Sequence, residues 1–300
     1  GGGRKTNLHD GSSNLDQVIR VIQCIQPDIL AVQEAVLQVD ADGNSHSSAQ
    51  SIAEDAGFAE RYAFGPTLSR CAHMNVHKKL FVNSIFQDEQ EWVQGNALFT
   101  RWEMVRLGNP AVGGTAANIP VFRPVLYEGN RDTDPRHALL ARINLPPLYP
   151  FVIGTHFTTL VNERTERSLD ALSESEHQLL QNRREAASRM RYDQARNILE
   201  LLSEHVLKKD QMVILMGDFN ALQSEACITD VLVEQGGFLH LDLKNPHIST
   251  HPKTTGAVDH ILIYPRRRVI DYTCSVVVSP ECEEASDHRP VAAEVELDLS

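Results

Sequence analysis

The sequence predicts a layered domain built from both strands and helices. Short apolar runs, typical of strands buried on both faces, alternate with longer segments whose apolar residues recur at helical spacing. No internal repeat, low-complexity tract or linker divides the 300 residues. Strands and helices packed in layers around one core are the simplest arrangement for this pattern. We therefore expect a single domain over residues 1–300.

The first helix and the first strand follow from their patterns. Ser12 and Ser13 are helix-capping residues, and the apolar residues after them recur at helical spacing until Pro27 ends the helix. The apolar run 29–32 then predicts a buried strand that ends at Glu34. A carboxylate is therefore expected at the carboxyl end of this strand.

The middle of the chain mixes clear and weak signals. A helix is expected near 47–56 and a strand over 95–101. The segment 107–135 is rich in Gly, Pro and Asn and has weak periodicity, so we expect a long loop or an excursion there. Segments 137–145 and 151–157 predict two antiparallel strands on either side of a Pro-Pro turn.

The second half predicts one long helix and four strands. Residues 173–208 are rich in Glu, Arg, Gln, Leu and Ala, contain no Pro or Gly, and carry a buried apolar stripe. The apolar run 212–216 predicts the strand that follows this helix. Three more strand-like runs cover 257–264, 269–278 and 290–297.

Composition excludes several classes of protein. The chain has 28 Lys and Arg against 40 Asp and Glu, which gives a formal net charge of -12. This charge argues against a protein that binds nucleic acid through a broad basic surface. No run of about 18 apolar residues exists, so no transmembrane segment is predicted. The five scattered cysteines form no C-x-x-C pair and no signal peptide is visible. These two features favour a reduced compartment, the cytoplasm.

Five polar clusters stand at or beside the expected strand ends, where layered folds place ligand sites. In an extended segment Asp218 and Asn220 point to the same side, toward one site, while Phe219 faces the core. Carboxylates suit Mg²⁺ or Mn²⁺, and histidine transfers protons near neutral pH, so the clusters indicate metal-assisted hydrolysis. The clusters are Gln33-Glu34, Thr155-His156, Asp218 with Asn220, Asp259-His260 and Ser286-Asp287-His288.

Each cluster alone also has an ordinary structural explanation. Gly, Asp and Asn form turns, so 217–220 and 286–288 read equally as loops beside strands. Glu34 reads equally as a surface carboxylate, and His156 as a hydrogen-bonded histidine beside the core. The identity of the site therefore depends on the whole set and its order.

Other candidate motifs carry little weight. His240, His247 and His251 are spaced unlike a zinc site and are expected in a loop. Trp92 and Trp102 are expected in the core rather than as stacking platforms for bases. No phosphate-binding G-x-x-x-x-G-K-[ST] loop and no H-E-x-x-H motif is present, so these mechanisms find no support.

Taken in order, with Gly95-Asn96-Ala97 after the first cluster, the motifs resemble the endonuclease/exonuclease/phosphatase superfamily. The resemblance covers nearly the whole chain. It implies an α+β fold, the four-layer α/β/β/α sandwich of two mixed sheets flanked by helices that deoxyribonuclease I-like proteins share. It also implies a divalent-metal-dependent phosphoesterase in which an activated water attacks in line.

The resemblance implies roles for the matched carboxylates and the amide. Glu34 would be the principal Mg²⁺ ligand, with Mn²⁺ as the alternative ion. Asp287 would assist at the metal, directly or through water. Asp218 and Asn220 would orient the attacking water and the phosphate, the first by accepting and the second by donating a hydrogen bond.

It implies roles for two histidines as well. His288 would act as general base or phosphate ligand, oriented by the carboxylate of Asp259, which would raise its pKa. His156 would contact the scissile phosphate or protonate the leaving group. Asn96 would lie in the same pocket.

One family feature is missing. The first strand of the family carries an Asn that helps to bind the metal, whereas Asn7 here has no apolar strand before it. We expect the sequence to begin just after that strand, with Gly1–Gly3 as the glycines that follow its motif. A cloning remnant is the alternative origin of these glycines. A chain without the strand would lose one metal ligand and leave a sheet edge or gap.

The class of substrate stays open at this stage. Family size favours a nuclease, but the acidic balance and the lack of a basic, aromatic-interleaved stretch favour a small-molecule or lipid-headgroup phosphate ester. The competing class of function is a catalytically silent binding or scaffold domain of the same fold. Retention of the acidic and histidine residues argues against it, because loss of catalysis releases such positions. No protein partner is predicted.

Overall fold

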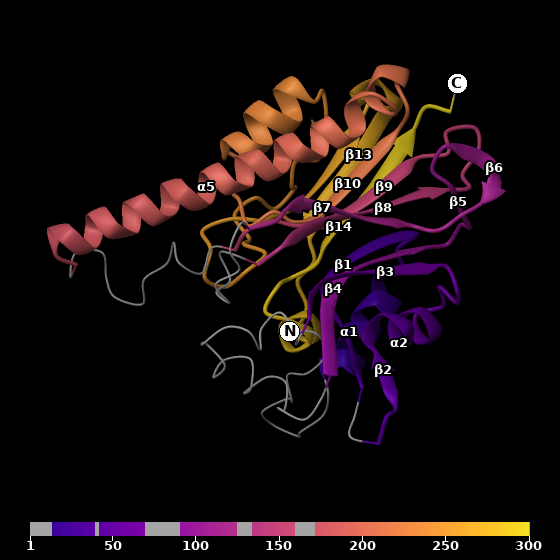
Figure 1. Cartoon of the computed structure of the whole chain (residues 1–300), viewed down its shortest axis with the longest axis horizontal. Helices are drawn as coiled ribbons and strands as arrows, with labels where there is room; N and C mark the ends of the chain where they lie inside the picture. Colours follow the sequence, from indigo (N-terminus) through magenta and orange to yellow (C-terminus); the bar gives the residue numbers. More distant parts are fainter. Residues whose placement is uncertain (1–13, 40–41, 70–90, 125–133, 160–171, 300) are drawn as a thin grey trace.

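Two β-sheets pack face to face and helices cover the outer face of each (Figure 1). The computed structural model describes residues 14–39, 42–69, 91–124, 134–159 and 172–299. Helices α1 (Asn14–Ile25) and α2 (Ser48–Asp55) cover one sheet, and the long helix α5 (Glu174–Ser203) covers the other. This is the predicted α+β fold, a four-layer α/β/β/α sandwich.

The first sheet is antiparallel, with the strand order β2-β1-β4-β3. Its strands are β1 (Ile29–Val39), β2 (Ser45–Ser47), β3 (Tyr62–Ser69) and β4 (Glu91–Thr100). The prediction that the first strand ends at Glu34 is wrong, because β1 continues to Val39. Its pairing with β4 shifts between Val32 and Ala35, so Gln33 and Glu34 form a bulge inside the strand.

The second sheet has the order β11-β12-β10-β9-β8-β5-β6, with β7 also paired to β8. Its strands are β5 (Met104–Arg106), β6 (Asn109–Gly113), β7 (Ala117–Phe122), β8 (Arg136–Ile143), β9 (Phe151–His156), β10 (Val213–Asp218), β11 (Leu239–His240) and β12 (Asp259–Tyr264). The expected antiparallel pair around the Pro-Pro turn is β8 and β9. Strands β9 and β10 are parallel, as a crossover through a helix requires, and α5 lies in that connection.

The expectation of a long loop over 107–135 is wrong for the part that the structure describes, since β6 and β7 lie in it. Strand β6 is largely exposed at the sheet edge, and β7 is only half-buried. Such strands form through pairing with a neighbour and leave little hydrophobic periodicity in the sequence.

The face between the sheets is apolar. Leu98 of β4 packs there with Leu139 of β8 and Val152 of β9, all almost fully buried. On the far side of the second sheet, Ile198 and Leu202 of α5 pack onto Leu215 of β10, and none of the three has exposed surface. This packing holds the strand ends of both sheets at one edge of the sandwich.

Helix α5 begins with the capping pair that its sequence provides. Ser173 accepts a hydrogen bond from the backbone N–H of Glu176, whose side chain accepts one from the backbone N–H of Ser173. The helix ends at Ser203, five residues before the predicted end, and a short 3₁₀ turn η3 (Leu207–Lys209) follows. A nine-residue π-helix, η4 (Cys227–Gln235), packs beside α5.

The last strands form a hairpin-like pair beside the second sheet. Strands β13 (Val269–Val276) and β14 (Val291–Leu297) pair antiparallel. The 3₁₀ turn η5 (Arg266–Arg268) precedes β13, and the short helix α6 (Pro280–Ala285) follows it. Helix α6 packs against α1 of the opposite layer, where the side-chain amide of Asn14 donates to the carbonyl of Ala285. This contact fixes the start of the loop that carries residues 286–288.

Several smaller expectations can be compared with the described residues. Trp92 is buried and Trp102 packs against the core between the sheets, as predicted. The cysteines in the described ranges are free: Cys24, Cys227, Cys274 and Cys282. Among the described helices, none combines the length and the apolar character that a membrane crossing needs. The calls on Ser12, Ser13, Asn7 and Gly1–Gly3 lie outside the described residues.

We predict that the apolar stripe of α5 contributes much of the stability of this layer. The substitution Leu202→Ala should lower the free energy of unfolding by about 3–5 kcal/mol, because it leaves a cavity against the sheet. Leu179→Ala, half-exposed on the same helix, should change it by less than about 0.5 kcal/mol. Urea denaturation of both variants measures this. Equal losses would contradict the packing described for α5.

Candidate active site

The predicted site residues come from both sheets and meet at one edge of the sandwich. Glu34 and Asn96 lie on β1 and β4 of the first sheet. His156, Asp218 and Asp259 lie at the ends of β9, β10 and β12, which are neighbours in the second sheet. The loop after α6 adds His288. The antiparallel and parallel pairings place Asp218 opposite both His156 and Asp259.

The bulge in β1 presents Glu34 to a cavity. Two residues of β1 stand opposite Asn96 alone, and Glu34 takes a left-handed backbone conformation with φ 58°. Such a conformation is uncommon for a residue other than Gly and often marks a functional position. Asn96 is buried and donates its side-chain N–H to the carbonyl of His137. The cavity is open to solvent, and its lining includes Glu34, Asn96, Asp134, Arg136 and His156.

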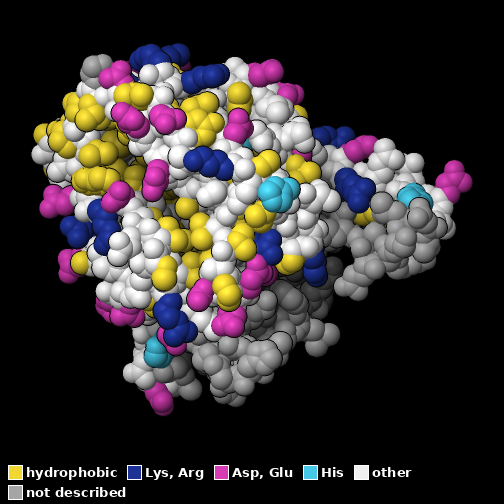
Figure 2. All heavy atoms as spheres, turned by 180° about the vertical axis from the view of Figure 1, so that it is seen from behind, with side chains coloured by type: hydrophobic (Ala, Val, Ile, Leu, Met, Phe, Trp, Pro, Cys, Tyr) yellow, Lys and Arg dark blue, Asp and Glu magenta, His cyan; other side chains and the backbone are white. Residues whose placement is uncertain are grey.

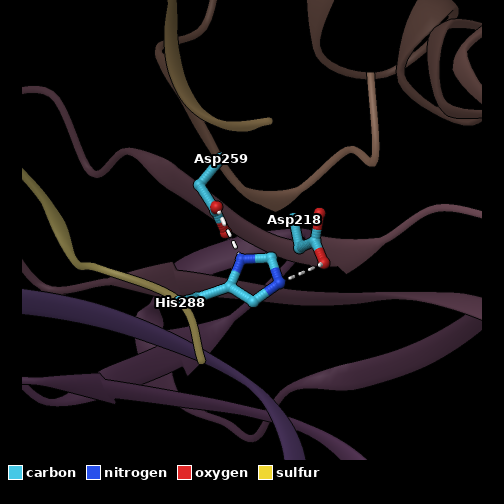
Figure 3. A group of neighbouring side chains, drawn as sticks. All are labelled: Asp218, Asp259 and His288. Carbon is cyan, nitrogen blue, oxygen red and sulfur yellow. Dashed lines mark hydrogen bonds and ion pairs between the residues drawn. The ribbon is translucent and has the colours of Figure 1, made fainter. Parts of the chain in front are cut away.

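Asp259, His288 and Asp218 form a row beside this cavity, joined by one hydrogen bond and one longer ion pair (Figure 3). Nδ1 of His288 lies 2.8 Å from Oδ2 of Asp259 and donates to it, because a carboxylate can only accept. The other ring nitrogen, Nε2, lies 3.8 Å from Oδ2 of Asp218. Nε2 of His156 lies 3.4 Å from the same Asp218 oxygen. Asp218 is therefore flanked by two imidazoles.

The turn after β10 differs from the extended segment that the sequence predicts. Strand β10 ends at Asp218, and Asn220 is left-handed with φ 48°. The backbone N–H of Asn220 donates to Oδ1 of Asp218 at 2.8 Å, and its Nδ2 donates to Oδ2 and to the carbonyl of Phe157. Phe219 has no exposed surface and packs edge-on against Phe157, as expected for a core residue. A tight turn, rather than strand alternation, brings the two polar side chains together.

Burial and neighbouring charges shift the acidity of this row. Desolvation, followed by the charge of Asp259, raises the pKa of Asp218 from 3.8 to about 7. For His288 the largest single effect is desolvation, which lowers its pKa. The hydrogen bond to Asp259 and the surrounding carboxylate charges outweigh it and raise the pKa to about 9. In the metal-free protein at neutral pH, the ring of His288 is therefore protonated and Asp218 is partly protonated.

The comparison with family models decides the identification. The model described as the Endonuclease/Exonuclease/phosphatase family matches residues 1–288. The chain belongs to this family. Members of the family are hydrolases that act on phosphoester bonds. The comparison with curated proteins found no match.

Solved structures of the family share the fold of this chain at low sequence identity. An endonuclease/exonuclease/phosphatase from Beutenbergia cavernae is 15% identical, with a TM-score of 0.65 over 98% of this chain and 69% of that one. The human Nocturnin catalytic domain with bound sulfate anion is 16% identical, with a TM-score of 0.58 over 95% and 86%. Truncated Caenorhabditis elegans TDP2 is 14% identical, with a TM-score of 0.52 over 94% and 89%. At these identities the likeness is one of fold.

The structure brings most of the predicted residues together, with Asp287 at the margin. Asp287 is exposed, and it lies outside the group of Asp218, Asp259 and His288, whose candidate ligand atoms all lie within 4.8 Å of one another. Its charge does contribute to the raised pKa of His288. Asp287 is thus close to the row but not part of it.

Sequence reasoning missed three side chains of this region. Asp134 and Arg136 line the cavity beside Glu34, and the ring of His251 lies 4.9 Å from that of His288. His247 and His251 lie in a loop, as expected, whereas that expectation is wrong for His240, which lies on β11. The only sequence signal for Arg136 was its place as a charged residue at the start of the apolar run of β8. No pattern in the sequence connects His251 with His288.

We predict that Asp218 makes the metal-free protein less stable as pH rises. Its pKa is raised by folding, so the folded protein keeps a proton that the unfolded chain loses above pH 3.8. The stability from that proton is complete below pH 3.8 and is lost as pH rises through about 7. Asp218→Asn should therefore gain stability relative to the wild type between pH 4 and pH 8. Denaturation in chelator at several pH values measures the difference.

Asp193→Asn, an exposed substitution on α5, is the matched control and should follow the wild type at every pH. If the stability of Asp218→Asn runs parallel to that of the wild type over the same range, the Asp218 carboxyl does not hold a proton on folding.

Proposed function

We propose that this chain is a divalent-metal-dependent phosphoesterase in which an activated water attacks the phosphate in line. The observation that carries this proposal is the row of Asp218, His288 and Asp259 beside the cavity that Glu34 lines. The row supplies a carboxylate of near-neutral pKa and a cationic imidazole at one place. These are the groups that deprotonating a water and binding a phosphate require.

The donor chemistry of the site fits a hard cation such as Mg²⁺ or Mn²⁺. Glu34 presents a carboxylate to the cavity and Asp287 offers a second, exposed one, whereas Asn96 adds an amide in the same cavity. Oxygen ligands of this kind suit Mg²⁺. When bound there, the cation would neutralise charge on a nonbridging phosphate oxygen. We assign Glu34 as its main ligand, with Asp287 assisting.

Asp218, Asp259 and His288 offer a second set of metal donors, but their bonding argues against that use. Nδ1 of His288 is occupied by its hydrogen bond to Asp259. Nε2 of His288 would have to lose its hydrogen before it could bind a metal, and the raised pKa of about 9 makes that loss unfavourable. The row is better suited to proton transfer and phosphate binding.

Each residue of the row and its neighbours then has its own role in the proposed reaction. Asp218 accepts the proton of the attacking water, and Asn220 fixes the direction of its carboxylate. His288, held by Asp259, directs a positive Nε2–H toward the same region and binds a phosphate oxygen. His156, on the other side of Asp218, is placed to contact the phosphate or to protonate the leaving group. This replaces the expectation of His288 as general base by its alternative, a phosphate ligand.

The substrate class we favour is a small-molecule or lipid-headgroup phosphate ester, with nucleic acid as the alternative. On the face shown in Figure 2, Lys and Arg side chains are scattered among Asp and Glu and form no continuous basic surface. The net charge of -12 points the same way. The sulfate in the Nocturnin structure is a tetrahedral oxyanion, and it supports a phosphate-binding use of the fold here.

We predict that hydrolysis depends on added metal through Glu34. With bis-p-nitrophenyl phosphate as substrate, EDTA should abolish turnover, and Mg²⁺ or Mn²⁺ should restore it. Glu34→Gln should need at least ~10-fold more metal for half-maximal rate, because it loses a charged ligand. Isothermal titration with Mg²⁺ should show the same weakening without substrate.

Glu294→Gln, an exposed substitution on β14, is the control and should behave as the wild type. Turnover that persists in EDTA would contradict the proposal. No turnover of diesters, monoesters, nucleic acids or lipids with either metal would favour the catalytically silent scaffold instead.

A further inference from the structure

Two buried histidines lie behind the turn that carries Asp218 and Asn220. Nε2 of His260, on β12, lies 2.8 Å from the carbonyl oxygen of Ala221. Nδ1 of His260 lies 3.0 Å from Nε2 of His240, on β11. Nδ1 of His240 in turn lies 3.3 Å from Oδ1 of Asp242. His240 is 8% exposed and His260 4%, so water does not compete for the contact between the two rings or for the contact of His260 with Ala221.

The partners of His260 determine where its proton lies. A carbonyl oxygen can only accept, so Nε2 of His260 carries the hydrogen in the bond to Ala221. In a neutral ring Nδ1 then has a lone pair and accepts from Nε2–H of His240. Burial lowers the pKa of both rings, that of His260 to about 4, which keeps them neutral.

With the hydrogens placed in this way, His240 forms no hydrogen bond with Asp242. A neutral His240 that donates from Nε2 presents a bare Nδ1 to Asp242, and two acceptors form no hydrogen bond. The distance of 3.3 Å is the longest of the three, and the Asp242 side chain is 70% exposed. Its Oδ1 accepts instead from the side-chain amide of Gln223 at 2.7 Å. The hydrogen bonds therefore run from His240 to His260 and from His260 to Ala221.

We propose that His260 is a positioning residue for the catalytic turn, with His240 fixing its tautomer; the effect on catalysis rests on the proposed function. Asn220 is left-handed, and such a conformation persists only where its surroundings hold it. His260 holds the turn on both sides of Asn220. Its Nε2–H binds the Ala221 carbonyl, and its ring packs against Phe219 at 5.7 Å between centroids.

Releasing the turn changes the orientation of the carboxylate of Asp218. Asn220 donates to both oxygens of Asp218, so a shift of Asn220 shifts the proton acceptor. A small misplacement of a reacting group lowers the rate of the chemical step more than it weakens binding of the substrate. His260 should therefore act on kcat rather than on KM.

The test compares two substitutions of His260 in the full-length, metal-loaded protein with bis-p-nitrophenyl phosphate. His260→Leu keeps an apolar side chain but removes the donor, and His260→Gln keeps an N–H donor near the position of Nε2. We expect His260→Leu to lower kcat by ~10- to 100-fold with KM within about threefold. His260→Gln should recover most of the loss. Unchanged kcat in His260→Leu, or equal losses in both variants, would overturn the proposal.

Two control variants separate this role from general effects. His247→Leu makes the same exchange at an exposed position and should leave kcat unchanged. Asp242→Asn should also leave kcat unchanged, because Asp242 accepts no hydrogen bond from His240. A tenfold or larger loss of kcat in Asp242→Asn would contradict the tautomer assigned to His240. Thermal unfolding of each variant shows whether it is folded.

A second measurement does not depend on hydrolysis. Long-range ¹⁵N–¹H correlation spectra of the imidazoles in the metal-free wild type should show both His240 and His260 protonated at Nε2 and bare at Nδ1. A hydrogen at Nδ1 of His260 would overturn the proposal. The expected tautomers without turnover of any phosphate ester would mean that the proposed function fails while the hydrogen-bonded pair stands.

Discussion

The hydrogen bond between His288 and Asp259 determines what each neighbouring group can do. It places a hydrogen on Nδ1 of His288. Burial lowers the pKa of His288, but this bond and the nearby carboxylates outweigh burial and keep the ring protonated. A protonated His288 can bind a phosphate oxygen, whereas acting as a metal ligand or as a general base would first require the loss of a proton. In the mechanism that we propose, Glu34 therefore binds the metal and Asp218 accepts the proton.

Packing away from the site makes this arrangement possible. Asp218 and Asp259 lie opposite each other on paired strands, whereas His288 reaches them from a loop whose start is tied to α1 through Ala285. The left-handed conformations of Glu34 and Asn220 are unfavourable on their own. A bulged pairing with β4 holds the first, and hydrogen bonds to Asp218 and Phe157 hold the second. Glu34 and Asn220 are two of the left-handed residues in the described part of the chain, and both lie at the site.

Much of this could be predicted from the sequence, because buried strands and long helices leave local patterns. The apolar run before Asp218 and the Pro- and Gly-free run of α5 each lie within one segment, and the order of the polar motifs is visible along the chain. The bulge at Glu34 could not be predicted, since it depends on the register between β1 and β4. Strand β7 could not, since it forms by pairing with β8. The contact of His240 with His260 likewise exists only because β11 and β12 pair.

The most direct test of this division of roles is the position of the metal. Anomalous diffraction from crystals of the full chain soaked in Mn²⁺ would locate the ion without any assumption about activity. Our assignment predicts one peak beside the carboxylate of Glu34, with Asp287 nearby and the bond between His288 and Asp259 intact. A peak among Asp218, Asp259 and His288, with that bond broken, would contradict it.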